Sequence, residues 1–141
     1  MLETIDNIKL NNKLISLLFN ILTNIMKTEL FSFNNTEYTI YIGQNKTENW
    51  EIIDAADSTD IWFHISNYPS CHVILKNIDC VKIRDIPRQV IKRAAYLCKI
   101  NSSAIIKSMK KCDVIYTPIS EVEKTEIVGQ VSVKTYKTIS T

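Results

Sequence analysis

The sequence has few of the residues that form tight turns, since its 141 positions include only two glycines and three prolines. We therefore expect turns built mainly from asparagine, aspartate and serine. No apolar run is long enough to cross a membrane, and a charged fraction of 23% argues against global disorder. With 45% hydrophobic residues, a chain of this length predicts one globular domain with a sizeable core.

The four cysteines form no Cys-x-x-Cys pair, and no secretory signal opens the sequence, because Glu3 and Asp6 stand where such a signal needs positive charge. We expect a cytoplasmic protein with reduced and mostly buried thiols. A zinc site made of Cys71, His72 and Cys80 is the alternative, but its spacing matches no common ligand pattern. The sequence thus predicts no metal and no cofactor.

Net charge is also small, at +2, but it is unevenly distributed. Residues 1–60 carry a net charge of −5, residues 61–75 carry no charged side chain, and residues 76–112 carry +8. A segregated basic block is typical of a surface that binds a polyanion. The same lysines would also suit a solvated helix face, and the charge pattern does not decide between the two.

Residues 3–27 predict a single apolar helix whose polar positions form one narrow stripe. Such a helix must bury most of its surface against the domain, a second copy of the chain or another protein. Interfacial attachment to a membrane is less favoured, because the polar stripe carries few cations.

From residue 29 the apolar period changes to two. A pair of strands is predicted within residues 31–43 around an Asn34-Asn35 turn. A short helix follows over residues 48–57, with Thr47 as the expected cap.

The stretch "DIWFHISNYPSCHVIL" contains both histidines and predicts two strands in the middle of a sheet. Its alternation places Ile61, Phe63 and Ile65 on one face. Trp62 and His64 then lie on the opposite face.

Residues 85–104 predict an amphipathic helix that begins near Pro87 and packs its apolar side on the sheet. A strand follows at 113–118, and a last strand or hairpin at 129–141 has Val131, Val133 and Tyr136 pointing inward.

The predicted fold class is α+β, with a mostly antiparallel sheet, a basic amphipathic helix packed on one face and an extra N-terminal apolar helix. We assign residues 1–28 to that helical extension and residues 29–141 to the domain.

Several of these segments resemble the NFACT-R domain, an RNA-binding domain formerly of unknown function. Its Asp-x-Trp-Phe-His and His-Val signatures match residues 60–64 and 72–73, and the likeness extends over residues 29–141. The sequence is most similar in kind to short stand-alone members related to the eukaryotic coiled-coil domain-containing protein 25. It departs from them in the apolar helix and in Ser70-Cys71 before the second histidine. The other matching segments are "YTIYIGQNKTEN", "DIPRQVIKRAAYLCKINS", "DVIYTP" and "VGQVSV".

The resemblance implies a non-catalytic RNA-binding module whose partner is tRNA or ribosomal RNA, with a link to translation or ribosome-associated quality control. The basic block would hold phosphates, and aromatic or imidazole rings would stack on unpaired bases. The candidate RNA-binding residues are Arg88, Lys92, Arg93, Lys99, Lys107, Lys110, Lys111, Trp62, His64 and His72.

Three alternatives remain at this point. Trp62 and the histidines could serve only the core and its hydrogen bonds. Residues 3–27 could bind a protein partner or a second copy, with RNA binding reduced or lost. An enzyme using Cys71 with a histidine is disfavoured, because no glycine-rich or helix-N-terminal context for an oxyanion site accompanies it.

Overall fold

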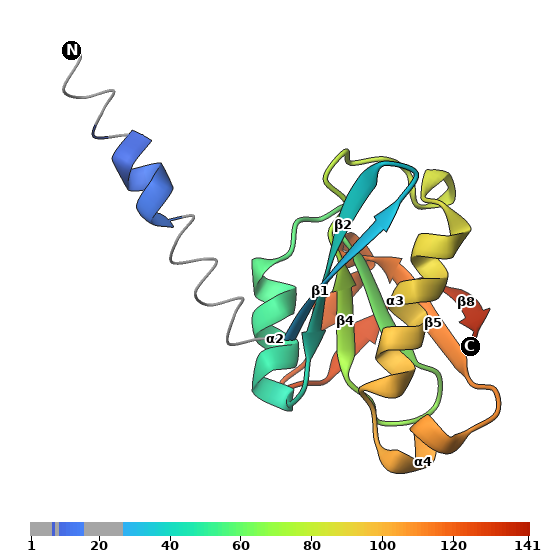
Figure 1. Ribbon diagram of the computed structural model, residues 1–141. Coiled ribbons are helices and arrows are strands. Elements are labelled where there is room, and N and C mark those ends of the chain that lie inside the picture. Colours follow the sequence, from blue (N-terminus) through green and yellow to red (C-terminus); the bar gives the residue numbers. More distant parts are fainter. Residues whose placement is uncertain (1–6, 8, 16–26) are drawn as a thin grey trace.

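The computed structural model describes residues 7, 9–15 and 27–141. Within this part, α2 separates two pairs of strands, and α3 and α4 separate the second pair from the last four strands (Figure 1). The helices are α2 (Lys46–Ala55), α3 (Arg88–Ile100) and α4 (Ala104–Ser108). The strands are β1 (Lys27–Phe33), β2 (Thr36–Gly43), β3 (Ile61–Ile65), β4 (His72–Leu75), β5 (Asp113–Pro118), β6 (Val122–Lys124), β7 (Val131–Val133) and β8 (Lys137–Ser140).

The main sheet has six strands in the order β1-β2-β4-β3-β5-β8, and every neighbouring pair is antiparallel. The basic helix α3 packs on one face of this sheet, and α2 covers part of the other (Figure 1). The α+β class, the antiparallel sheet and the basic helix on one face are therefore confirmed.

The first hairpin closes at the predicted asparagine pair. Asn34 and Asn35 have φ angles of 48° and 62°, and Phe33 pairs with Thr36 across them. Positive φ at both central residues is the geometry that matches the twist of a tight hairpin, and asparagine tolerates it better than most residues. In a chain with only two glycines, asparagine takes this place.

The stretch with both histidines forms the centre of the sheet, as predicted. β3 and β4 pair with each other and lie between β2 and β5. Ile61, Phe63 and Ile65 join the main core under α3, whereas Trp62 belongs to a second cluster under α2. The alternation of side chains in this hairpin is thus confirmed.

The cap predicted for the short helix was wrong. Asn45, not Thr47, is the N-cap, and its side-chain oxygen accepts a hydrogen bond of 2.9 Å from the amide of Glu48. The side-chain Nδ2 of Asn45 also donates to the Glu48 carboxylate at 2.5 Å, so the two side chains are joined at the start of the helix. The helix consequently begins at Lys46.

The long predicted helix at 85–104 is shorter than expected. A 3-10 turn occupies Ile83–Asp85, Pro87 is the N-cap, and α3 ends at Ile100. The chain then restarts as α4, where the Ser103 side chain caps the new helix. Serine competes well for backbone hydrogen bonds, so the Asn-Ser-Ser segment interrupts the helix that the apolar period alone would extend.

The C-terminal segment divides between two sheets. β7 pairs with β6 in a separate two-stranded sheet, whereas β8 joins the edge of the main sheet beside β5. Val131 and Val133 pack against the second cluster, as predicted. Tyr136 was predicted inward and this was wrong, because it lies between the two strands with 58% of its surface exposed.

Most of the helix predicted at 3–27 lies outside the described residues. Residues 9–15 are helical, and all of them are exposed. At the other end of this prediction, Lys27 already belongs to β1. None of the helices in the described part of the chain has the length and apolar character that crossing a membrane requires.

Candidate nucleic-acid interface

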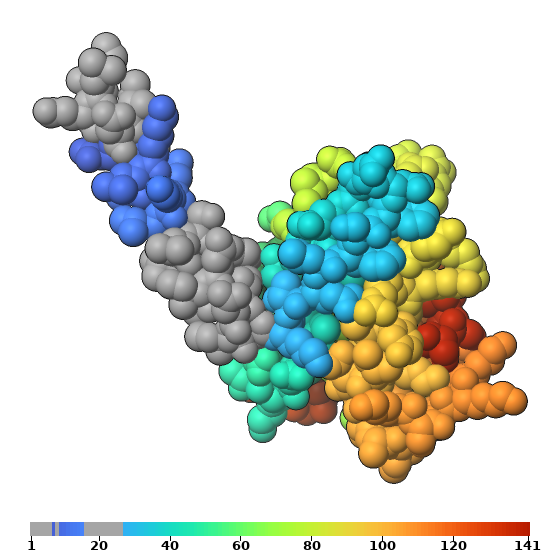
Figure 2. All heavy atoms as spheres, in the orientation of Figure 1, coloured from blue at the N-terminus to red at the C-terminus, as the bar shows by residue number. Residues whose placement is uncertain are grey.

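The segment from residue 86 to residue 112 contains seven cations and no carboxylate. It forms α3, α4 and the loop before β5, which lie together on the face seen in Figure 2. Five of the cations are exposed and have no ion pair among the described residues. We call these five the basic rim: Arg88, Lys92, Lys107, Lys110 and Lys111.

Two predicted phosphate ligands are held by the fold instead. The Arg93 guanidinium forms two hydrogen bonds to the Glu29 carboxylate, at 2.8 and 2.5 Å, and this pairing with Glu29 raises the pKa of Arg93. It therefore fastens β1 to α3. Lys99 donates to the carbonyl oxygen of Thr141 at 3.2 Å, and so holds the end of the described chain. Neither cation is as free to meet a phosphate as the basic rim.

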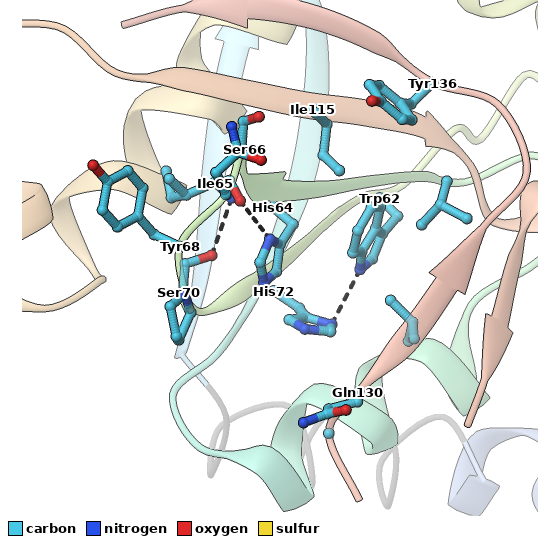
Figure 3. A pocket seen from close by; sticks show the side chains of 15 residues that line it. Trp62, His64, Ile65, Ser66, Tyr68, Ser70, His72, Ile115, Gln130 and Tyr136 are labelled. Carbon is cyan, nitrogen blue, oxygen red and sulfur yellow. Dashed lines mark hydrogen bonds between the residues drawn. The ribbon is translucent and has the colours of Figure 1, made fainter. Parts of the chain in front are cut away.

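The other three predicted residues meet on the opposite face of the sheet, in a pocket with a volume of about 560 Å³ (Figure 3). We call it the histidine pocket. Trp62 and His64 lie parallel at 5.6 Å between ring centroids, and His72 stands edge-on to His64 at 5.0 Å. The ring of Trp62 is almost fully buried, with 1% exposed, so it forms part of the core as well as part of the pocket wall.

Hydrogen bonds fix which nitrogen carries the proton in each imidazole. The indole N–H of Trp62 donates to His72 Nδ1 at 3.1 Å, so neutral His72 carries its proton on Nε2. His64 Nδ1 lies 2.6 Å from the carbonyl oxygen of Ile65, which can only accept, so neutral His64 has a bare Nε2. One ring thus presents a donor at Nε2 and the other an acceptor.

Both Nε2 atoms are open to the pocket. Within the described chain neither has a hydrogen-bond partner, and the one sealed side-chain atom without a partner is Glu48 Oε1. Figure 3 shows the rings of His64 and His72 beside each other in the pocket, where they are in edge-to-face contact. The pocket therefore offers one donor and one acceptor at neighbouring positions.

Burial keeps both imidazoles neutral. It lowers the pKa of His72 to about 3, with the neighbouring His64 adding to the shift. Burial also lowers the pKa of His64, against the opposing effect of its hydrogen bond to the Ile65 carbonyl. A neutral pair at physiological pH cannot attract phosphate by charge, so any contact of these rings with RNA would involve a base or a sugar.

The backbone around His72 depends on the nearby glycine at the end of β2. The Asn49 side-chain oxygen of α2 accepts from the His72 amide at 3.1 Å. A Cβ atom at Gly43 would lie 2.3 Å from that oxygen and 3.0 Å from the Asn49 backbone. Only glycine therefore lets α2 approach β4 closely enough to hold His72.

The aspartate of the Asp-x-Trp-Phe-His signature also has a structural task. Asp60 is buried, and its two oxygens accept from the amides of Asp57 and Asn77, each at 2.9 Å. One oxygen also accepts from the Lys76 ammonium at 3.0 Å. These bonds fix the start of β3 and, through it, the positions of Trp62 and His64.

The geometry places Cys71 on the opposite face of the sheet from the two histidines, so these residues do not form the nucleophile and base considered above. Cys71 does not line the pocket; its Sγ packs in the main core, 3.2 Å from the carbonyl oxygen of Cys98. Adjacent residues in an extended chain face opposite sides, so Cys71 turns away from the face of His72. In the part of the chain that is described, no three His, Cys, Asp or Glu side chains are placed to hold a metal ion.

Several pocket residues were not identified from the sequence. Tyr68 and Ser70 come from the β3–β4 loop, and Gln130 and Tyr136 from either side of β7. Tyr68 lies in a polar loop, and an aromatic residue among the polar residues of a predicted loop is a signal that the sequence does contain. Gln130 gave no such signal and Tyr136 was assigned to the core, because the role of both residues depends on the separate β6–β7 sheet.

Comparison with known proteins matches this fold and these motifs. Residues 27–135 match the family model described as NFACT protein RNA binding domain. Coiled-coil domain-containing protein 25 of Bos taurus is 43% identical over 94 residues, or 67% of this chain and 45% of that protein. Protein JLP2 of Saccharomyces cerevisiae is 35% identical over 108 residues, or 73% of this chain and 51% of that protein. The chain thus spans about half the length of the curated relatives it matches.

A solved structure shares the fold at lower identity. The C-terminal part of the fibronectin/fibrinogen-binding protein from Streptococcus suis superposes with a TM-score of 0.67 at 23% identity, over 81% of this chain and 44% of that one. The family match covers β1 to β7 and includes the histidine hairpin and α3. The chain belongs to the NFACT protein RNA binding domain family, with relatives among its stand-alone members.

Proposed function

We propose that this chain binds RNA, without catalysis, chiefly through contacts between the basic rim and the phosphate backbone. The observation that carries the proposal is a 27-residue segment with seven cations and no carboxylate, five of whose cations are exposed and unpaired in the described structure. Such a surface gives affinity that depends strongly on salt and little on sequence. The family's description as an RNA-binding domain supports the proposal.

The rim is long enough to follow several phosphates. α3 has 13 residues, so its axis is about 20 Å long. Arg88 and Lys92 lie on the first two turns of α3, while Lys107, Lys110 and Lys111 follow its C-terminal end. We propose tRNA or ribosomal RNA as the partner, in the cytoplasm and in connection with translation or ribosome-associated quality control, on the strength of the family resemblance.

Charge reversal tests the rim directly. We expect the double variant Arg88→Glu/Lys92→Glu to lose retention on tRNA or ribosomal RNA at low salt, with an unchanged circular dichroism spectrum. The matched control is Lys9→Glu/Lys13→Glu, which makes the same change of charge at two other exposed lysines. RNA affinity that falls equally in both pairs, or in neither, would contradict the proposal.

A second candidate function rests on the N-terminal segment. Leu10, Leu14 and Ile15 lie on a helix with 56%, 48% and 63% of their surfaces exposed. An apolar helical surface of this kind is suited to a protein partner or a second copy of the chain. Deleting residues 1–26 should then abolish association, measured by analytical ultracentrifugation, while RNA affinity stays unchanged. Loss of RNA affinity on that deletion would argue against two separate functions.

A further inference from the structure

We propose that the histidine pocket takes one unpaired nucleobase of the RNA strand, with the base edge bonded by His64 and His72 and its faces against the exposed rings of Tyr68 and Tyr136. This inference rests on the proposed RNA-binding function and adds to it a second contact, on the opposite face of the sheet from α3. The chemical class follows from three properties of the pocket: its missing charge, its aromatic walls and its pair of polar atoms.

The pocket carries no formal charge. None of the 15 described residues that line it is Lys, Arg, Asp or Glu. Its two titratable imidazoles are neutral at physiological pH, and its remaining titratable side chains are the phenols of Tyr68 and Tyr136. A phosphate or a carboxylate would lose its hydration here without gaining a counter-charge. The occupant is therefore a neutral group.

The walls suit a flat occupant. Trp62 and His64 stack in parallel on one side of the pocket, and Val131 and Val133 of β7 also line it. At the mouth, Tyr68 and Tyr136 leave 46% and 58% of their surfaces exposed (Figure 3). Exposed rings beside a pocket are the usual platform on which a splayed base stacks. A volume of about 560 Å³ lies within the usual range for a small-molecule site.

The polar floor matches a base edge. His72 offers an N–H at Nε2, His64 offers a lone pair at Nε2, and the two rings are in edge-to-face contact. The Watson–Crick edge of each nucleobase carries an adjacent donor and acceptor, which is the complementary pattern. Because all four bases share this feature, the pocket selects for an unpaired base rather than for one sequence. This agrees with binding that is directed mainly at the backbone.

The pocket and the rim meet at one edge of the domain. The β3–β4 loop, which carries Tyr68 and forms a pocket wall, is joined to the start of β5 by a hydrogen bond of 2.8 Å from the Ser66 amide to the Asp113 carbonyl. Lys111 and Lys110 lie two and three residues before Asp113. A strand held by these two lysines can thus turn one base over the loop into the pocket.

Nucleosides test the pocket without any help from phosphate. Adenosine, guanosine, cytidine and uridine should each shift the indole N–H signal of Trp62 and the ring signals of both histidines in NMR spectra of the full chain. The shifts should saturate and should persist in Arg88→Glu/Lys92→Glu. Ribose 5-phosphate is the control and should leave all three residues unmoved. If no nucleoside moves these signals, or ribose 5-phosphate moves them equally, the inference is overturned.

A second arm uses RNA itself. Tyr68→Ala and Tyr136→Ala remove exposed rings, and each should weaken binding of single-stranded RNA by about tenfold while leaving blunt duplex RNA unaffected. Equal weakening for single strands and duplexes, or no weakening at all, would overturn the pocket. The two proposals fail separately: salt-dependent RNA binding without nucleoside binding removes only the pocket. Nucleoside binding with RNA affinity unchanged by rim reversal removes only the rim.

Discussion

The two faces of the central sheet differ in the kind of chemistry they offer. The α3 face carries exposed cations on α3, α4 and the loop before β5, with no carboxylate between residues 86 and 112. The opposite face carries neutral rings in a pocket, with no charged residue among those described in its lining. The hairpin of β3 and β4 contributes to both faces, because successive residues of each strand point to opposite sides of the sheet.

Because the histidines and the cations lie on opposite faces of the sheet, they do not form one site. Phosphate requires charge at the surface, whereas a base requires a dry, flat and neutral space. A sheet with one face for each allows both without compromise. The predictions below ask whether the faces are as separate as this geometry implies.

The largest expected effect is on stability, at the shared wall of core and pocket. Trp62→Ala should destabilise the domain by about 3–5 kcal/mol, because it removes a buried aromatic ring and its hydrogen bond to His72. Lys92→Ala, on the exposed side of α3, should have little effect. Urea denaturation checks both. Trp62→Phe is the conservative variant and should recover most of the lost stability. Equal stability of Trp62→Ala and Lys92→Ala would contradict the proposed difference between the pocket face and the α3 face.

Acid should lower the free energy of unfolding of the domain through the two buried histidines of the pocket. The folded-state pKa of His72 is about 3, below its ordinary value of 6.5 in the unfolded chain, so the unfolded state binds protons that the folded state does not. The contribution of His72 to the free energy of unfolding is complete above pH 6.5 and is lost as the pH falls towards 3. The loss is about 1.4 kcal/mol per pH unit for this one group. The lowered pKa of His64 acts in the same direction.

The measurement is the free energy of unfolding of wild type and His72→Gln at pH 7, 6 and 5. Glutamine can still accept the Trp62 N–H bond but does not titrate in this range. The variant should therefore lose stability less steeply than wild type below pH 6.5. Identical slopes for the two proteins would show that His72 is not held neutral by burial.

A smaller effect is expected at the ion pair that joins β1 to α3. Glu29→Gln should cost about 1 kcal/mol, since both side chains of the pair are about one-third exposed. It should also raise RNA affinity by a few-fold, because Arg93 is then released beside the rim. Affinity is measured by fluorescence anisotropy, with Glu37→Gln on the neighbouring strand as the control. A fall in affinity would mean that Arg93 already binds RNA from its paired position.

The elements that depend on a local sequence pattern could be predicted from the sequence. Alternation in the histidine hairpin predicted which side chains face α3, and the asparagine pair predicted the first turn. The seven cations of residues 86–112 could be listed, but their availability could not, because the Arg93–Glu29 pair joins residues 64 positions apart. Local pattern says nothing of such a partner.

The pocket could not be predicted from the sequence. One wall of the pocket comes from β7 and its flanking loops. β7 forms a second sheet with β6, and it lies near Trp62 only in the folded chain. Tyr136 was predicted inward because its segment was treated as one strand or hairpin, whereas β7 and β8 belong to different sheets. The proton positions on His64 and His72 likewise depend on hydrogen bonds that only the folded chain contains.

The division between the two faces is tested most directly by the salt dependence of single-stranded RNA affinity. For Arg88→Glu/Lys92→Glu, the slope of log K against log salt should become shallower by about 2, because two phosphate contacts are lost. For Tyr68→Ala, affinity should fall by a similar factor at every salt concentration, with the slope of wild type. If Tyr68→Ala also flattened the slope, or the rim variant left it unchanged, the proposed separation of backbone and base contacts would be contradicted.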